Sequence, residues 1–83
     1  MEAKLAVIIE MIDNLVSDNT VPKNIRKILT DSKDRLNGPE DIDVKISAAI
    51  YLIESISDDI NMPSHARTQI WAIMSALEGI KQG

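Results

Sequence analysis

The chain has no cysteine and no phenylalanine, and its 83 residues include only one tryptophan, one tyrosine, three glycines and three prolines. Without cysteine it can form no disulfide, no thiolate metal site and no thiol nucleophile, which is compatible with a reducing cytosol. Because helix-breaking residues are scarce while isoleucine and leucine are abundant, the composition favours a folded helical chain over a disordered one.

Long apolar runs are also missing. No stretch approaches the roughly 20 residues that a membrane-spanning helix needs. The chain starts with one acid and one base, Glu2 and Lys4, and the apolar segment that follows is soon broken by Glu10 and Asp13. We therefore expect no signal peptide, no membrane association and a cytoplasmic location. A length of 83 residues predicts a single domain, 1–83, with one modest core.

The sequence repeats itself, without a gap, at an offset of 41 residues. The identical pairs include Lys4/Lys45, Ile9/Ile50, Ile12/Ile53, Asp18/Asp59, Pro22/Pro63, Arg26/Arg67 and Leu36/Leu77. A shared amphipathic period would align the apolar positions but not the aspartate, proline and arginine. A unit of this length matches HEAT and armadillo repeats, and the order apolar helix, Asp, short corner, Pro-x-x-x-Arg resembles the HEAT pattern.

Apolar residues recur at helical spacing in four segments, about 3–17, 22–36, 42–58 and 63–80. Short links make successive helices antiparallel neighbours. We therefore predict an all-α, up-and-down four-helix bundle built from two HEAT-like hairpins, about 3–36 and 44–77. With only two repeats, the hairpins must cover each other's apolar faces or pair with another chain, as a closed bundle or as an open stack.

Each hairpin corner carries an aspartate followed by an arginine, Asp18 with Arg26 and Asp59 with Arg67. The structural interpretation is that each aspartate accepts hydrogen bonds from amides at the next helix start and forms an ion pair with its arginine. The functional alternative is a paired carboxylate–guanidinium binding site. We favour the structural interpretation, because a unique active site is rarely duplicated within one chain.

Nothing in the sequence forms a catalytic or metal-binding constellation. His65 is the only histidine; it lies near Asp58 and Asp59 but lacks a second ligand at metal-binding spacing and a partner nucleophile. Four carboxylates are expected on the solvated outer faces of the first and third helices: Glu10, Asp13, Glu54 and Asp58. We predict no catalytic residue, no metal, no cofactor and no identifiable small-molecule substrate.

Charge is unevenly distributed. The segment 22–36 holds five of the nine basic residues and two acids, a local charge of +3 in a chain of net charge −4. The residues that could meet phosphates there are Lys23, Arg26, Lys27 and Arg35. Nucleic-acid surfaces usually add more bases and stacking aromatics, which this segment lacks. A nucleic-acid-associated accessory protein is therefore the alternative hypothesis.

A few large apolar residues lie off the main helical stripes: Met11, Tyr51, Leu52 and Trp71. Either the edges of the bundle bury them, or they form a patch for another protein or a second copy of the chain. Aromatic residues and methionine are enriched at such interfaces. The leading hypothesis is thus a non-enzymatic helical protein–protein interaction module, acting as a homodimer or as a small assembly subunit, through this patch or the outer side of the first helix.

Three stretches carry a resemblance to a known family: residues 21–28 (VPKNIRKI), 43–53 (DVKISAAIYLI) and 61–71 (NMPSHARTQIW). They resemble uncharacterised protein family 0147, a small archaeal family, and the resemblance covers nearly the whole chain. It implies a compact bundle of four helices and a cytoplasmic archaeal protein. The family has no established activity, cofactor or catalytic residue, so the resemblance supplies no site residues.

Overall fold

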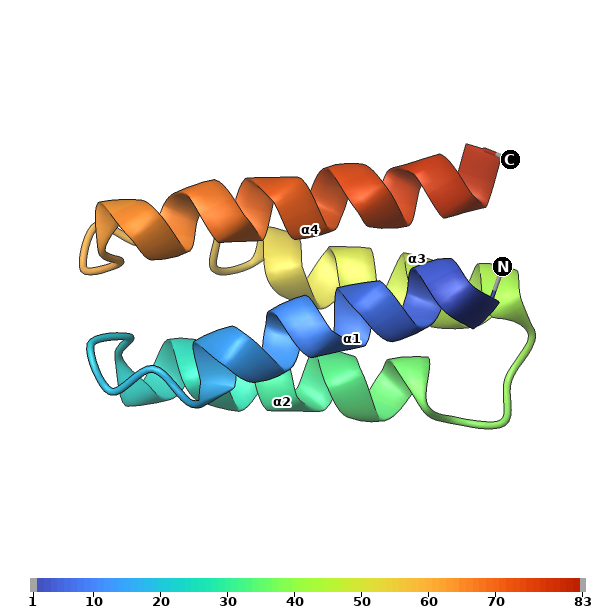
Figure 1. The fold of residues 1–83 in the computed structure, drawn as a ribbon, viewed down its shortest axis with the longest axis horizontal. Coiled ribbons are helices and arrows are strands. Elements are labelled where there is room, and N and C mark those ends of the chain that lie inside the picture. The colour runs from blue at the N-terminus through green and yellow to red at the C-terminus, as the bar shows by residue number, and fades with distance from the viewer. Residues whose placement is uncertain (1, 83) are drawn as a thin grey trace.

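The computed structural model describes residues 2–82, which form four α-helices and, in that range, no strand (Figure 1). The helices are α1 (Glu2–Val16), α2 (Lys23–Leu36), α3 (Ile42–Glu54) and α4 (Ser64–Gln82). The predicted all-α architecture of four helices is confirmed. A first corner, residues 17–22, joins α1 to α2, a second corner, residues 55–63, joins α3 to α4, and a link, residues 37–41, joins the two hairpins.

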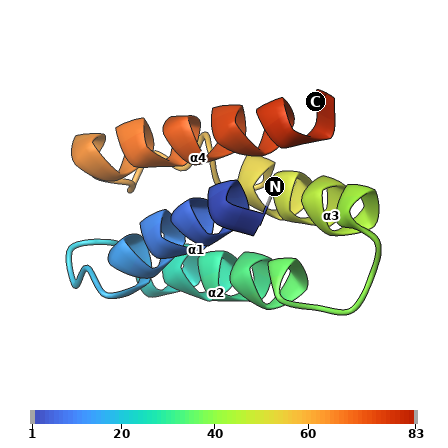
Figure 2. The same ribbon diagram turned by 45° about the vertical axis from the view of Figure 1, so that its right-hand side comes forward.

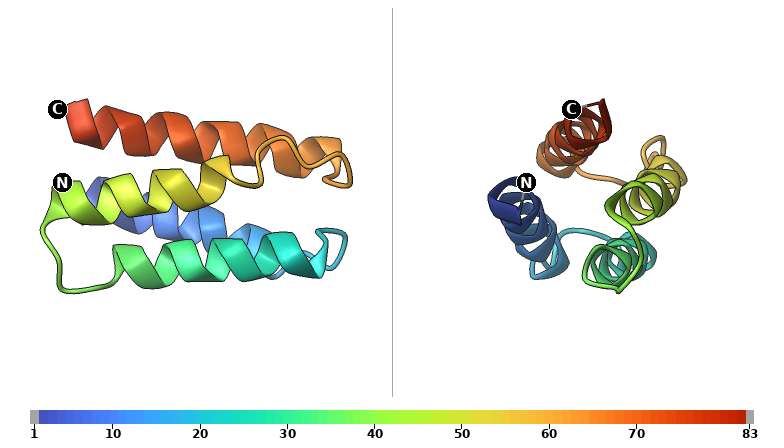
Figure 3. Two further views of the ribbon diagram at one scale, coloured as in Figure 1. Left: turned by 180° about the vertical axis from the view of Figure 1, so that it is seen from behind. Right: turned by 90° about the vertical axis from the view of Figure 1, so that its right-hand side faces the viewer.

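The helices form a closed ring. Each packs against two neighbours in the order α1, α2, α3, α4 and back to α1, and within residues 2–82 the diagonal pairs have no Cα atoms within 8 Å of each other. The end view places the helices around a central core (Figure 3). Both corners lie at one end of the bundle, while the link and the outer ends of α1 and α4 lie at the other (Figures 1 and 2).

This ring differs from a HEAT stack. A HEAT solenoid would pack equivalent helices side by side, α1 on α3 and α2 on α4, whereas among the described residues these are the diagonal pairs, whose backbones do not approach each other. Instead, an approximate twofold axis along the bundle relates the hairpins, so α2 packs on α3 and α4 on α1. Because there are only two hairpins, the twofold arrangement buries the apolar face of each hairpin against the apolar face of the other. A stack of two hairpins would not bury both faces.

Residues at equivalent positions of the two repeats form most of the core. Seven repeat pairs are hydrophobic and buried in both hairpins: Ile8/Ala49, Ile12/Ile53, Leu15/Ile56, Val21/Met62, Ile25/Ala66, Leu29/Ile70 and Leu36/Leu77. In an eighth buried pair, Ser32 is the repeat equivalent of Ile73 and the one polar member. The Ser32 hydroxyl donates to the backbone oxygen of Ile28 at 2.9 Å. Each hairpin therefore contributes the same positions to one shared core, as the offset of 41 residues predicts.

The third helix is shorter than predicted, ending at Glu54 rather than near residue 58. The hydroxyls of Ser55 and Ser57 donate to the backbone oxygens of Leu52 and Glu54. The amides of residues 56 and 57 bond three residues back rather than four. Serine hydroxyls that compete for helical carbonyls favour turns over continued helix, so the chain tightens here into the second corner.

None of the helices within residues 2–82 combines the length and the apolar character required to cross a membrane.

Candidate functional site

The two corners are built by the same hydrogen bonds. The amide of Thr20 donates to Asp18 Oδ1 at 2.9 Å, and the amide of Asn61 donates to Asp59 Oδ1 at 2.8 Å. Side chains that accept from the amide two residues ahead form Asx turns, which reverse the chain. The predicted role of the aspartates as acceptors for backbone amides is thus found, although in the corner itself, three residues ahead of α2 and α4.

The predicted ion pairs Asp18–Arg26 and Asp59–Arg67 are wrong. Arg26 Nε instead donates to the backbone oxygen of Val21 at 3.0 Å, and the Arg67 guanidinium donates to the backbone oxygens of Ser57 and Asp59 at 3.2 and 3.0 Å. Carbonyls in the corners have no helical amide to accept from, and they lie within reach of each guanidinium. The arginines therefore tie the corner backbones, and the aspartate side chains contact the opposite hairpin.

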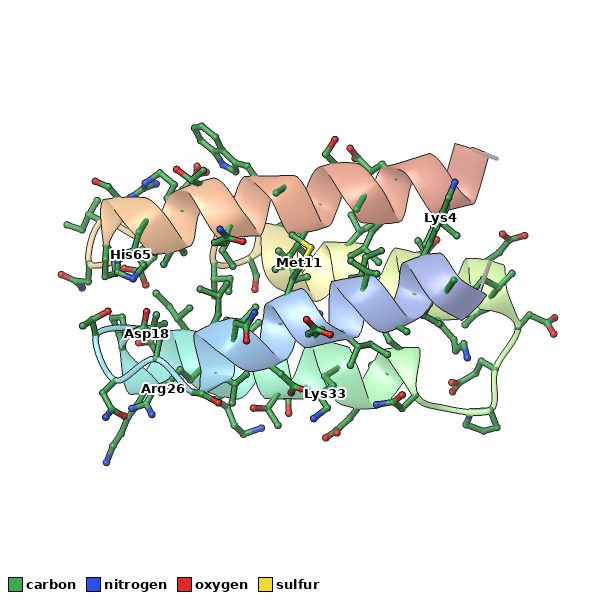
Figure 4. The ribbon with its side chains drawn as sticks, in the orientation of Figure 1. Lys4, Met11, Asp18, Arg26, Lys33 and His65 are labelled. Carbon is green, nitrogen blue, oxygen red and sulfur yellow. The ribbon has the colours of Figure 1, made fainter. Side chains whose placement is uncertain are left out.

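The carboxylates reach across the twofold axis. His65 Nε2 lies 2.7 Å from Asp18 Oδ2, and Thr20 Oγ1 donates to Asp18 Oδ1 at 2.6 Å. In the other direction, Asn24 Nδ2 donates to Asp59 Oδ2 at 3.3 Å. Asn24 and His65 are repeat equivalents, so the bundle makes the same contact twice, with an amide on one side and an imidazole on the other. Asp18 and His65 face each other between the corners (Figure 4).

Hydrogen bonds keep the Asp18 carboxyl ionised. Hydrogen bonds from the Thr20 hydroxyl, from His65 and from the Thr20 amide lower the pKa of the Asp18 carboxyl from 3.8 to about 2. A carboxyl with such a pKa is a weak base at neutral pH. Thr20 and Asp18 also lie beside the same imidazole nitrogen, 3.3 and 2.7 Å away, whereas a catalytic relay uses both ring nitrogens. The arrangement therefore fits a structural role, a clamp in which Asp18 and His65 hold the two hairpins together.

The contact of His65 with the opposite hairpin was not predicted from the sequence, which placed His65 only near Asp58 and Asp59. The repeat could have indicated this contact, because the offset of 41 aligns His65 with Asn24, and each lies two residues after the corner proline. Among the described side chains, no group of three or more histidines and carboxylates lies close enough together to hold a metal ion.

The basic residues of α2 are partly engaged within the chain. Lys27 Nζ donates to both carboxylate oxygens of Asp31, at 2.8 and 2.9 Å. Arg26 is half-buried on the first corner, while Lys23 and Arg35 are exposed. Of the four candidate phosphate contacts, Lys27 therefore has an acidic partner and Arg26 a backbone one, which leaves Lys23 and Arg35 for a phosphate.

The four candidate interface residues separate into two groups. Tyr51 and Trp71 are 75% and 58% exposed, so the bundle does not bury them. Met11 and Leu52 are half-buried. These two are repeat equivalents, and Met11 alone belongs to a larger surface feature, a groove at the seam between α1 and α4.

This α1/α4 groove has a volume of about 520 Å³. Its lining residues are Ala3, Lys4, Val7, Ile8, Met11, Ala76, Gly79 and Ile80. Lys4 and Met11 both point from α1 toward α4 (Figure 4). Val7 is 59% exposed. The lining is apolar except at Lys4, so the groove presents a hydrophobic surface at the end of the bundle opposite the corners.

Two sequence differences explain why the groove opens at this seam and not at its twofold equivalent, α2/α3. Where α1 carries Val7 and Ile8, α3 carries Ala48 and Ala49, whose small side chains allow close approach, and α3 packs more extensively on α2 than α1 does on α4. In addition, Lys45 Nζ donates to the backbone oxygen of Gly38 in the link at 3.1 Å. No segment of the described chain joins α4 to α1 in this way.

Comparisons with known proteins identify relatives that match most of this chain. A UPF0147 protein of Methanothermobacter thermautotrophicus is 43% identical over 74 residues, which are 88% of this chain and 72% of that protein. A UPF0147 protein of Methanocaldococcus jannaschii is 45% identical over 73 residues, 86% of this chain and 77% of that one.

Two crystal structures share the fold. One, of a protein of unknown function, has a TM-score of 0.87 and 43% identity, and the match covers 90% of this chain and 86% of that chain. The other, a UPF0147 protein from Thermoplasma acidophilum, has a TM-score of 0.90 and 32% identity over 95% of this chain and 94% of that chain. A model of UPF0147 matches residues 1–80, and the chain therefore belongs to this uncharacterised protein family, which has archaeal members and no known function.

Proposed function

We propose that this chain is a non-enzymatic helical protein–protein interaction module that acts in the cytoplasm. The observation that supports this most is the α1/α4 groove, an apolar depression of about 520 Å³ in the surface of a small bundle. Concave apolar surfaces of about this size are typical of binding sites, and large exposed apolar patches are uncommon on monomeric proteins. Val7, at this seam, is 59% exposed, so a partner that covers it would remove apolar surface from water, which favours binding.

The chemistry of the lining favours binding over catalysis. Acid–base and nucleophilic catalysis need two or more groups held within hydrogen-bonding distance of the same reacting atom. Among the described lining residues of the groove, only Lys4 is ionisable. The polar side chains that meet across the hairpins, Asp18 with His65 and Asn24 with Asp59, belong to the corners at the other end of the bundle, and none of them is buried.

The alternative is an accessory protein that binds nucleic acid through α2. Lys23 and Arg35 are exposed on this helix and could contact phosphates. Lys27 is paired with Asp31, and Lys33 Nζ donates to Asp13 Oδ1 on α1 at 2.7 Å, so two bases of the helix already have acidic partners within the chain. This alternative has the weaker support.

A tagged pull-down from lysate of the native host, with and without nuclease, tests the proposal. A protein partner that survives nuclease and high salt is the expected result. Partners that disappear with nuclease, and that are also lost in a Lys23→Ala, Lys27→Ala, Arg35→Ala variant, would replace it by the nucleic-acid alternative. Arg26 is left in place in that variant because it holds the first corner.

A further inference from the structure

We infer that the α1/α4 groove is the docking site for one amphipathic α-helix of a partner protein, which brings three apolar residues along one face and an acidic residue beside them. This inference rests on the proposed interaction function and names the kind of partner that the groove accepts.

The walls of the groove require an occupant that satisfies its own backbone. Both walls are helices, α1 and α4, whose mid-helix amides and carbonyls are paired along the helix and offer nothing to an incoming peptide. An extended peptide laid here would bury unpaired backbone groups against apolar side chains, at a cost for each group. A helix carries its backbone hydrogen bonds with it, and helix-in-groove docking relies on side chains alone.

The dimensions of the groove suit about two helical turns. On α1 the lining runs from Ala3 to Met11, and at about 1.5 Å per residue this is about 12 Å. Apolar residues at positions i, i+4 and i+7 of a partner helix span about the same length. Small residues at Ala3, Ala76 and Gly79 let a helix approach closely, and a Cβ added at Gly79 would meet no atom within 4 Å.

Charge at the groove indicates an acidic residue on the partner. Lys4 lines the groove and has no acidic partner among the described side chains. Its repeat equivalent, Lys45, donates to the backbone oxygen of Gly38, an acceptor that the link brings to the twofold-related seam. The α1/α4 seam has no link among the described residues, so a carboxylate on the partner helix would supply the acceptor that Lys4 lacks.

A second copy of the chain is the competing occupant. Its α3 exposes Val44 and Tyr51 at i and i+7, with Ala48 between them and Asp41 and Asp43 close by in sequence. However, α1 and α3 are diagonal in the bundle, so the groove and the exposed face of α3 point in different directions. Pairing them would be head-to-tail and open-ended unless it closed into a ring. A separate partner helix fills the groove and ends the assembly, which is why we favour it.

Selection from two displayed libraries tests the inference on the full chain. One library presents a helix scaffold with randomised positions on one face, and the other presents unconstrained peptides. We expect enrichment of the helix library, with apolar residues at i, i+4 and i+7 and an Asp or Glu beside them. Binding should fall at least tenfold on Gly79→Leu, which fills the groove, and should persist on the matched control Gly79→Ala. A Lys4→Glu bait should select Lys or Arg where the native bait selects acids.

Three results would overturn the inference: enrichment of unconstrained peptides alone, binders that Gly79→Leu retains equally, or binders indifferent to the charge at residue 4. A dimer in solution that Gly79→Leu dissociates would identify the occupant as a second copy and overturn it as well. Pull-downs with Gly79→Leu separate this failure from that of the proposed function. A partner that the variant still captures leaves the interaction function standing without the groove, whereas no partner for either protein contradicts both.

Discussion

His65 Nε2 on α4 lies 2.7 Å from Asp18 Oδ2 in the first corner, and the approximate twofold axis repeats this contact as Asn24 with Asp59. The two hairpins are thus joined at one end by reciprocal polar contacts, in addition to their shared apolar core. An isologous arrangement of this kind is usual between the subunits of a dimer. Here it occurs within one chain, between its two repeats.

Asp18 should titrate near pH 2. Because its pKa in the folded protein is about 2, below the ordinary value of 3.8, the unfolded chain binds the proton more readily between these pH values. The stability that Asp18 contributes is therefore fully present above about pH 4 and is lost as the pH falls through 2. Carboxyl ¹³C NMR of Asp18 against pH checks this, and a midpoint near 3.8 would contradict it. In Asp18→Asn this part of the acid loss should vanish, while Asp58→Asn, in the exposed second corner, should retain it.

Replacing His65 by asparagine should preserve the clamp. The substitution His65→Asn gives the second hairpin the residue that the first has at the equivalent position, Asn24, which already donates to an aspartate across the axis. Thermal unfolding should rank His65→Asn close to the native protein and above His65→Ala. If alanine and asparagine prove equivalent, the side-chain contact with Asp18 contributes nothing to stability.

Gly79→Ala should raise the free energy of unfolding by about 0.5–1 kcal/mol, because glycine within a helix costs this much relative to alanine. An added Cβ meets no atom within 4 Å at this site. The repeat equivalent, Gly38→Ala, is the control: its Cβ would lie 3.2 Å from the backbone oxygen of Arg35 and 2.8 Å from Glu40 Oε1, and it lies outside the helices, so it should gain no stability. Urea unfolding of both variants is the measurement, and equal gains would contradict the account.

The repeat also predicts equal costs in the core. Ile12 and Ile53 are repeat equivalents with no exposed surface, so Ile12→Ala and Ile53→Ala should each lower the free energy of unfolding by about 2–5 kcal/mol. Denaturant unfolding should show both losses as a lower midpoint at unchanged slope. A cost below about 1 kcal/mol for one of them alone would mean that the hairpins do not share the core equally.

Much of this fold follows from the sequence. Apolar spacing and the corner prolines located all four helices. The shortened α3 was not predicted, because the competition of Ser55 and Ser57 for helical carbonyls depends on local geometry that apolar spacing does not report.

The candidate site was harder to predict. Spacing placed an aspartate and an arginine in each corner but not the direction of their side chains, and nearby carbonyls proved the nearer acceptors for Arg26 and Arg67. The groove is lined by residues of α1 and α4, two helices that are distant in sequence, so it depends on how these helices pack in the folded bundle. Such separations arise only once all four helices are in place.

Site-specific photo-crosslinking in living host cells would show whether the α1/α4 groove is the surface that binds a partner. A photoreactive amino acid is placed at Val7 in the groove and, in separate proteins, at Lys27 on the basic helix and at Trp71 on the exposed side of α4. We expect one protein to be crosslinked from Val7 at high yield, with the crosslink lost when Gly79→Leu is added. Crosslinks from Lys27 or Trp71 with none from Val7 would show that the groove is not the binding surface and would contradict the account.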